Sequence, residues 1–276
     1  VDFDKVRYFR RCQLSNEQEA RGVTLNASKV LNLSDFKPDK QSGGGETENP
    51  GDTLAFLKKY LKLTHCDLFF ADAVVLVEGT VEKILMPSML EMASPKLKHV
   101  YLTILEVGGA YAHRFASLLE FIGLHYLIIT DIDSVDPTNN RSACRADTNG
   151  AVTSNAAIKF FLGMDSVADL GGLNSENQAV SGGDGYISYQ KPSSVEGYAD
   201  ETTMHGRTLE ETFIYENISL YRNGNLPNNI TFDASPEHEN EYTKILHEKG
   251  IYLILIYTNN ANFGEKVSEK GVPHIL

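Results

Sequence analysis

The amino-acid sequence predicts an α/β fold with a Rossmann-like, mostly parallel sheet flanked by helices. Two observations lead to this prediction: apolar runs alternate with segments of helical spacing, and two of the runs stop abruptly at acidic residues. An apolar run bounded by turn residues is typical of a strand buried on both faces, as in a parallel sheet. Alternation of such strands with helices predicts right-handed crossovers between parallel strands.

The alternation is clearest in the middle of the chain. Apolar runs predict strands at 73–77, 100–107 and 126–130, and helical spacing predicts helices at 80–92 and 111–121. Weaker signals flank this region. They predict strands at 6–12, 22–28, 186–190 and 249–257, and helices at 52–63, 156–162, 209–215 and 235–248.

We expect the chain to divide into two regions. Residues 1–65 supply short strands, a polar Gly-rich linker and a helix, which lead into a catalytic domain over residues 66–276. Within that domain, turn-rich segments predict a helical or loop insertion over about residues 136–205. The predicted fold therefore includes a smaller helical element, drawn from the insertion and the C-terminal segments.

Composition narrows the classes of function. The formal net charge of −12 argues against simple electrostatic binding of nucleic acid, which normally needs a basic surplus. Cys12, Cys66 and Cys144 are scattered without a CxxC pair, which argues against a disulfide framework or a zinc site and suits a reducing cytoplasm. No apolar stretch approaches the length of a membrane span. The chain starts at Val1 rather than Met, which suggests a fragment of a longer protein.

Acidic pairs follow two of the predicted strands. Glu78 ends one apolar run and Glu82 falls in the first turn of the next helix, while Asp131 and Asp133 end another run. On an extended chain the two aspartates would point to the same side, and Ile132 to the core. Because functional groups gather at the carboxyl ends of parallel strands, all four carboxylates should meet in one small volume. Only a cation can hold them there, so the sequence predicts a metal site.

Each acidic pair also has a plainer interpretation. Glu82 can complement the helix dipole while Glu78 lies in a solvent-exposed loop, and Asp131 and Asp133 can be turn formers. Two acidic pairs that each end a buried strand favour the metal site. Arg114, in the helix predicted at 111–121, is either a phosphate contact or a solvated helix-face residue.

The arrangement strand–EGxxE, helix, strand–DxD resembles the Toprim domain. This catalytic fold is shared by topoisomerases, bacterial-type primases, recombination-repair proteins and OLD-family nucleases, named for overcoming a lysogenisation defect. Three longer strings are similar to the C-terminal Toprim region of the OLD group. They are THCDLFFADAVVLVEGTVEKILMP, VGGAYAHRFASLLEFIGLHYLIITDIDS and GRTLEETF.

The resemblance implies an endonuclease that hydrolyses DNA phosphodiesters with two metal ions. Ligands that are all oxygen, with no His or Cys, select Mg²⁺ or Mn²⁺ rather than Zn²⁺. By position, the implied metal ligands are Glu78, Glu82, Asp131, Asp133 and one acid of a later LE-type motif, either Glu210 or Glu211. Glu211 also forms a predicted capping box with Thr208, which leaves the choice open.

The family pattern also implies a catalytic lysine, partners and a larger protein. With Glu78 and Asp131, the implied catalytic set includes Lys249, for which Lys244 and Lys266 are rivals. OLD-family proteins carry an N-terminal ABC-type ATPase domain, and this chain contains no GxxxxGK[ST] motif. The implied partners are therefore DNA, that ATPase domain and a second copy of the chain in a homo-oligomer, without a membrane.

Two rival functions stay open at this point. One is another Toprim chemistry, that of a primase or a topoisomerase. No tyrosine is placed convincingly as a topoisomerase nucleophile, and no Cys/His cluster supplies the zinc module of a primase. The other is a catalytically silent Toprim that only binds nucleic acid or assembles, against which the intact EGxxE and DxD motifs argue.

Overall fold

A computed structural model describes most of the first four-fifths of the chain. The described residues are 3–12, 27–38, 42–43, 46–47, 49–63, 66–93, 97, 100–108, 111–173, 179–180, 185–194 and 203–216. The helix predicted at 235–248 and the strand predicted at 249–257 lie outside them, and so do Lys244, Lys249 and Lys266.

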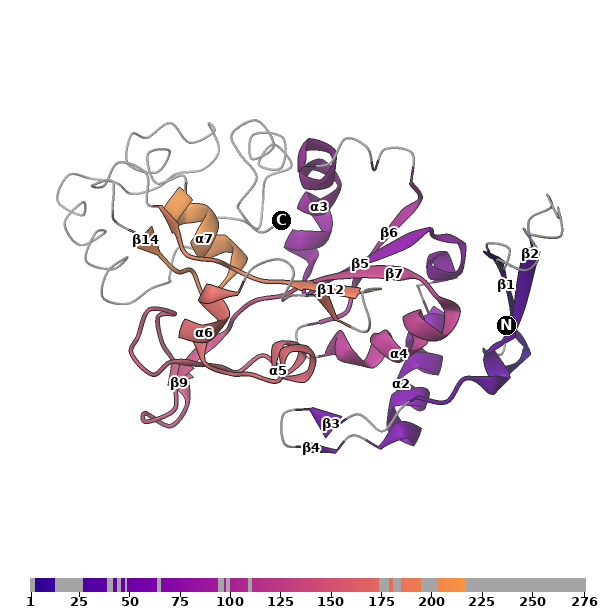
Figure 1. Ribbon diagram of the computed structural model, residues 1–276, viewed down its shortest axis with the longest axis horizontal. Helices are drawn as coiled ribbons and strands as arrows, with labels where there is room; N and C mark the ends of the chain where they lie inside the picture. The colour runs from indigo at the N-terminus through magenta and orange to yellow at the C-terminus, as the bar shows by residue number, and fades with distance from the viewer. Residues whose placement is uncertain are drawn as a thin grey trace, which may run out of the picture.

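A five-stranded sheet forms the centre of the fold (Figure 1). Its parallel strands are β6 (Leu102–Glu106), β5 (Ala73–Val77), β7 (His125–Ile129) and β12 (Gly185–Ser188), in that order. The short strand β11 (Ala179–Val180) pairs antiparallel with β12 at the edge. The α/β prediction with a mostly parallel sheet is therefore confirmed.

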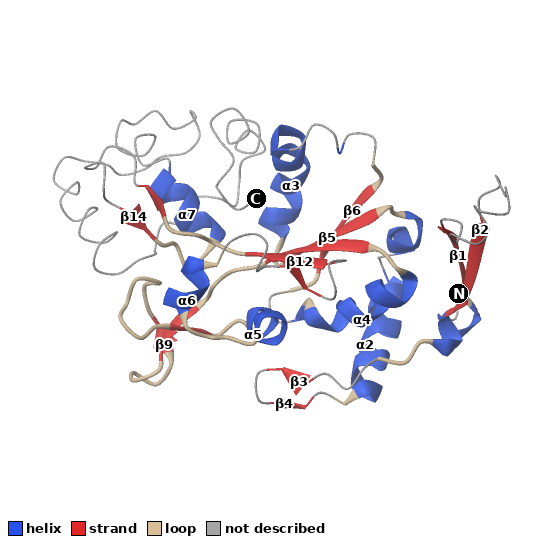
Figure 2. Cartoon of the chain, in the orientation of Figure 1, coloured by secondary structure: helices blue, strands red, loops and turns tan. Residues whose placement is uncertain are grey.

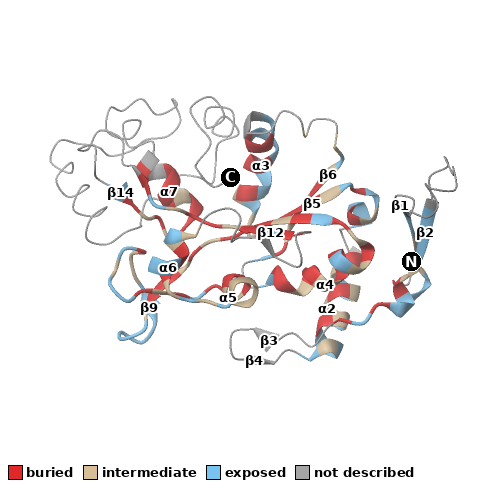
Figure 3. Cartoon of the chain, in the orientation of Figure 1, coloured by how far each residue is buried: buried red, intermediate tan, exposed pale blue. Residues whose placement is uncertain are grey.

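Strand β5 shows why helices cover both faces of this sheet (Figures 2 and 3). Successive side chains of a strand point to opposite faces. Val74 and Leu76 belong to a core shared with the helices α2 (Pro50–Leu63), α4 (His113–Ile122) and α5 (Ala156–Leu162). Val75 and Val77 belong to a second core, shared with α3 (Thr80–Ala93) and α7 (Leu209–Glu216). The apolar run of the sequence thus fills two cores at once.

The strand register places the carboxyl ends of three strands at one edge. Val77 of β5 is level with Ile129 of β7, which is level with Ser188 of β12. The segments that follow these strands therefore leave the sheet side by side. They begin with Glu78, Thr130 and Tyr189, respectively.

Shorter elements surround the sheet. Near the N-terminus, β1 (Arg7–Cys12) pairs antiparallel with β2 (Ala27–Asn32). After β7, the strands β8 (Ser134–Asp136), β9 (Ser142–Ala143) and β10 (Val152–Thr153) form a small sheet in the order β10-β8-β9. The remaining elements are the 3-10 helices η1 (Phe3–Lys5), η2 (Leu33–Asp35) and η3 (Cys66–Phe70), the strands β3 (Ser42–Gly43), β4 (Glu46–Thr47), β13 (Ser193–Ser194) and β14 (Thr203–Met204), and the helix α6 (Val167–Gly172).

Several boundaries differ from the sequence-based prediction. The strand predicted at 22–28 is found at Ala27–Asn32 within the described residues, because its register is set by pairing with β1. Helix α2 begins at Pro50 rather than Asp52, since proline is well suited to a first helical position. The region expected to be an insertion over 136–205 also contributes β12 to the central sheet. None of the helices in the described ranges is long and apolar enough to cross a membrane.

Candidate active site

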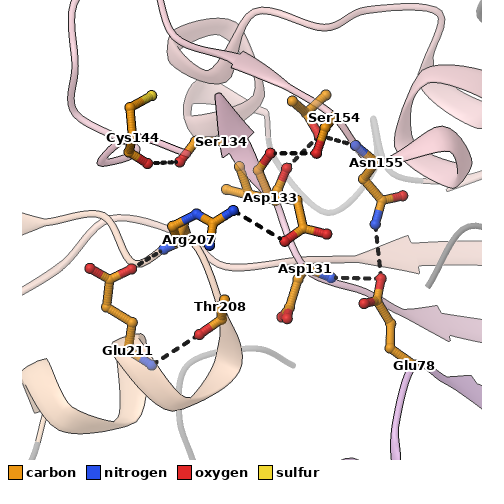
Figure 4. A network of polar contacts seen from close by, with 12 residues as sticks. Glu78, Asp131, Asp133, Ser134, Cys144, Ser154, Asn155, Arg207, Thr208 and Glu211 are labelled. Atoms are coloured by element: carbon orange, nitrogen blue, oxygen red, sulfur yellow. Dashed lines mark hydrogen bonds and ion pairs between the residues drawn. The ribbon is translucent and has the colours of Figure 1, made fainter. Parts of the chain in front are cut away.

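Glu78 and Asp131 meet where β5 and β7 end (Figure 4). The backbone N–H of Asp131 donates a hydrogen bond to Oε1 of Glu78 over 3.2 Å, and the hydroxyl of Thr130 donates to the same oxygen. Gly79 follows Glu78, and a Cβ at this glycine would lie 3.0 Å from a carboxylate oxygen of Glu82. The structure thus brings together two of the acids singled out in the sequence.

A buried asparagine holds Glu78 from the insertion side. Asn155, which is 5% exposed, donates from Nδ2 to Oε1 of Glu78 over 2.8 Å and to the Thr130 hydroxyl over 2.8 Å. Its Oδ1 accepts from the backbone N–H groups of Ala157 and Ile158, so the same side chain caps α5. The position of the Glu78 carboxylate is therefore tied to the start of a helix.

Asp131 is held from two other directions. Its Oδ1 accepts from Nε2 of Gln190 over 2.6 Å and from the backbone N–H of Leu209 over 3.0 Å. Gln190 follows β12 and Leu209 is the first residue of α7. A carboxylate at a helix N-terminus satisfies a backbone donor and complements the helix dipole. The site is thus assembled from segments more than fifty residues apart in sequence.

The sequence predicts an extended backbone at Asp133, and this prediction is wrong. The φ angle of Asp133 is 51°, in the left-handed region, where aspartate is among the more tolerated residues. The Asp133 N–H donates to the carbonyl of Arg207 over 3.1 Å, and its carbonyl accepts from the N–H of Ser154 over 3.0 Å. These bonds fix the turn, and Oδ1 of Asp133 lies 3.5 Å from Nη2 of Arg207.

The carboxylates of Glu78, Glu82, Asp131, Asp133 and Glu210 affect one another's charge, and we call them the acidic group. Glu82 also has a structural contact. Its carboxylate accepts from the N–H of Gly79 over 3.0 Å, and the residue is 6% exposed. Glu82 therefore stabilises the start of α3, which is the plainer role that the sequence also predicted. Its pKa is raised by burial and, secondarily, by the charges of Glu210 and Glu78. Helix capping and the acidic group therefore share this residue.

Of the two acids in the LE motif, Glu210 is the one whose charge raises the pKa of Glu82, Asp131 and Asp133. The Glu211 carboxylate is 4% exposed and accepts from the N–H of Arg207 over 2.6 Å and from the hydroxyl of Tyr215 over 2.8 Å. The Thr208 hydroxyl caps the N–H of Glu211, as expected for one half of a capping box. The other half differs, because the Glu211 carboxylate binds Arg207 N–H instead of Thr208 N–H.

The carboxylates repel one another. Burial raises the pKa of Glu78 and of Asp133, and it raises that of Asp131 well above the ordinary range. The charges of Glu78 and Glu210 add to the rise at Asp131, and that of Glu210 adds to the rise at Asp133. Both effects disfavour the charged form of a carboxyl, and a bound cation would reverse them.

The donor chemistry of this acidic group fits a hard divalent ion. All of its side-chain donors are carboxylate oxygens, which suit Mg²⁺ or Mn²⁺. A bound cation would favour the charged form of these carboxyls, which burial and mutual repulsion now disfavour. Within the described residues, no three His, Cys, Asp or Glu side chains already form a metal-binding group. A divalent ion held by these carboxylates would therefore require them to lie closer together than they do in this structure.

Three site residues were not found from the sequence. Asn155 and Gln190 are neutral amides in loops, for which no periodicity or motif gives a signal. Arg207 belongs to the string GRTLEETF, in which only the two acids were predicted to be site residues.

Arg114, predicted to be either a phosphate contact or a solvated residue, stacks its guanidinium over the rings of Tyr111 and Phe56, at 4.9 and 5.2 Å from their centroids. Two aromatic rings thus contact this charge.

Comparison with known proteins agrees with the fold and the acidic motifs. Residues 69–133 match the model of the Toprim domain of overcoming lysogenization defect protein-like proteins. The chain is 29% identical over 233 residues to the endonuclease GajA of Bacillus cereus strain HuB5-5, which covers 80% of this chain and 31% of that protein. It is 33% identical over 85 residues to the endonuclease GajA of strain VD045, covering 31% of this chain and 15% of that protein.

The match has clear limits in both chains. The chain spans about a third of the length of the first GajA protein. The family match includes Glu78, Glu82, Asp131 and Asp133, whereas Asn155, Gln190, Arg207 and Glu210 lie beyond it. The acidic motifs, the parallel sheet and the family match coincide in one region. Residues 69–133 therefore form a Toprim domain that is similar to that of overcoming lysogenization defect protein-like proteins.

Proposed function

We propose that this chain is the nuclease part of a larger protein and cleaves DNA by metal-dependent hydrolysis of phosphodiester bonds. The observation that carries the proposal is the junction of Glu78 and Asp131 at the carboxyl ends of β5 and β7, where both carboxyls are half-buried and have a raised pKa. The similarity to two endonucleases supports the same reaction class.

The metal ligands of the proposal are five acids. They are Glu78, Glu82, Asp131, Asp133 and Glu210. Glu211 is left out because its carboxylate is buried against Arg207 N–H and the Tyr215 hydroxyl. Two Mg²⁺ or Mn²⁺ ions held there would supply an activated water and offset the charge of the leaving oxygen.

The residues around the acids have defined tasks in this proposal. Thr130 and Asn155 orient Glu78, and Gln190 with the Leu209 N–H orients Asp131. Groups that orient the ligands of a metal tune its affinity and its reactivity. Lys249, with Lys244 and Lys266 as rivals, stays a candidate for a catalytic cation outside the described residues.

The partners of the proposal are those of a larger ATPase–nuclease. DNA is the substrate, an ABC-type ATPase domain lies elsewhere in the protein, and a second copy of the chain is a partner in a homo-oligomer. The fraction of GajA that the chain spans leaves room for such a domain.

Supercoiled plasmid tests the proposed function. The protein that contains the whole chain should nick the plasmid in Mg²⁺ or Mn²⁺, and the D131N variant should lose this activity. D169N changes an exposed aspartate in α6 and is the matched control, which should nick as the unmodified protein does. An intact plasmid under every metal, or equal nicking by D131N, would contradict the proposal and favour a binding or assembly module.

A further inference from the structure

Arg207 enters the acidic group from the loop before α7 (Figure 4). Its side chain is 16% exposed, and its guanidinium points toward Asp133. Both backbone polar groups of Arg207 are hydrogen-bonded. Its N–H donates to Glu211 over 2.6 Å, and its carbonyl accepts from the N–H of Asp133. The guanidinium is therefore held at the edge of the acidic group by the start of α7.

The donors of this guanidinium are incompletely used. Its distance to Asp133, 3.5 Å, is longer than the 2.7–2.9 Å of a close charge-assisted hydrogen bond. Its Nε is buried and has no hydrogen-bond partner within the described part of the chain. A buried donor on a charged group is costly when it is left unsatisfied, so this geometry is suited to an anion that completes it.

A second arginine of the chain shows how a closed structural pair looks. Arg145 contacts Asp147 twice, from Nε to Oδ1 over 2.8 Å and from Nη2 to Oδ2. This is the bidentate geometry in which a guanidinium satisfies a carboxylate. Arg207 makes no such double contact with Asp133 among the interactions of the described residues. The ion pair with Asp133 therefore leaves at least one N–H donor of the Arg207 guanidinium, that of Nε, without a partner among the described residues.

We infer that Arg207 is a catalytic residue that binds a non-bridging oxygen of the DNA phosphate next to the bond that is cut. The inference rests on the proposed nuclease function. A planar guanidinium fits phosphate through two parallel N–H donors, and it stays protonated throughout, so it transfers no proton. A fixed cation at this position also offsets the charge that develops on the phosphate oxygens in the transition state.

Variants of Arg207 and Arg145 separate this role from a structural one. Binding of a short duplex is measured by fluorescence anisotropy in Ca²⁺ over a series of salt concentrations. R207M should weaken binding and lower the salt slope by about 1, as the loss of one phosphate contact does. R145M removes a cation of similar burial from outside the acidic group, and it should bind the duplex as the unmodified protein does.

Two further measurements use the same variants. Plasmid cleavage at saturating Mn²⁺ should fall about 10²–10³-fold in R207M, the usual effect of losing one donor that stabilises transition-state charge. R207K should recover part of the activity. Binding of Mn²⁺ without DNA should be unchanged or tighter in R207M, because Asp133 loses a cation that competes with the metal.

Two results would overturn the inference. One is that R207M binds and cleaves DNA as R145M does. The other is that R207M loses Mn²⁺ affinity in proportion to its activity, which would make Arg207 a support of the metal ligands. The nuclease proposal is judged separately, by cleavage in the unmodified protein and its loss in D131N. If the unmodified protein does not cleave, the nuclease proposal fails, and the duplex-binding comparison still decides the phosphate contact of Arg207.

Discussion

The side-chain amide of Gln190 donates a 2.6 Å hydrogen bond to the carboxylate of Asp131. The carbonyl oxygen of the same amide accepts from the N–H of Ile132 over 2.9 Å. Gln190 is 1% exposed, so one buried side chain fixes both the main chain and the acid at the end of β7. Because Gln190 follows β12, the last parallel strand of the sheet sets the geometry of its neighbour's acidic motif.

The first prediction concerns this contact. In Q190E the side chain keeps an acceptor for the Ile132 N–H but loses the donor to Asp131 and adds a negative charge. We expect cleavage or metal affinity to fall about 10–100-fold, the usual effect of changing a group that orients a metal ligand. The Mn²⁺ concentration for half-maximal plasmid nicking measures this.

A neighbouring lysine provides the control for Q190E. Lys191 donates to the carbonyls of Leu170 and Leu173, away from the acids. K191M should lower the free energy of unfolding without shifting the Mn²⁺ dependence. Equal Mn²⁺ dependence in Q190E and the unmodified protein would show that Gln190 does not position Asp131.

The second prediction separates the two roles of Asn155. N155S keeps an oxygen that can cap α5 but is too short to reach Glu78, whereas N155A loses both contacts. Both variants should lose nicking activity to a similar extent. Only N155A should also lose the cap, which costs about 1 kcal/mol of unfolding free energy relative to N155S. Urea denaturation and the nicking assay measure the two effects.

The control for Asn155 is the cap of another helix, and this cap has no hydrogen bond to any of the site's acids within the described residues. Ser166 caps α6 by accepting from the N–H of Asp169 over 3.3 Å. S166A should lower the free energy of unfolding and leave nicking intact. If N155S nicks at the same rate as the unmodified protein, the bond from Asn155 to Glu78 has no functional role.

The third prediction distinguishes the two acids of the LE motif. E210Q should abolish nicking while the free energy of unfolding stays the same or rises, because one source of repulsion on Asp131 and Asp133 disappears. E211Q should lower the free energy of unfolding by about 1–3 kcal/mol, since a buried carboxylate loses part of its bonding. The reverse pattern in the two assays would assign the metal ligand to Glu211.

The fourth prediction is the pH dependence of the metal-free protein. Burial first, and the neighbouring charges second, raise the pKa of Asp131, so the folded state holds its proton more tightly than the unfolded state does. The slope of stability with pH is then negative between the two pKa values. In EDTA, stability should fall as pH rises above about 4, the ordinary pKa of an aspartate, until the raised pKa is passed.

The D131N variant isolates this effect from that of other groups. The difference in melting temperature between D131N and the unmodified protein should grow in favour of D131N across the same pH window, because asparagine does not ionise. Saturating Mg²⁺ should reduce the difference by offsetting the charge. A difference that is independent of pH in EDTA would refute the raised pKa of Asp131.

The sequence predicted the parts of the fold that follow from local pattern. The strand at 73–77 and the helix at 156–162 have the predicted bounds, because apolar runs and the Gly163 that ends the helix are local signals. The order of the central strands followed less directly. β12 was predicted as a strand at 186–190, but its place beside β7 depends on long-range pairing that no periodicity encodes.

The acidic site was predictable only in part. The motifs identified Glu78 and Asp131 because each ends a buried strand, and the register then brings them together. The extended geometry assumed for Asp133 was wrong, because contacts with Arg207 and Ser154 hold a left-handed turn there. The choice between Glu210 and Glu211 needed the tertiary contacts of Glu211 with Arg207 and Tyr215.

The measurement that tests the central claim most directly is an anomalous diffraction experiment on crystals soaked in Mn²⁺. We predict a Mn²⁺ ion within about 2.0–2.6 Å of carboxylate oxygens of both Glu78 and Asp131, the usual range for hard cations and oxygen ligands. An occupied Mn²⁺ site elsewhere, with no ion in contact with either carboxylate, would contradict the account.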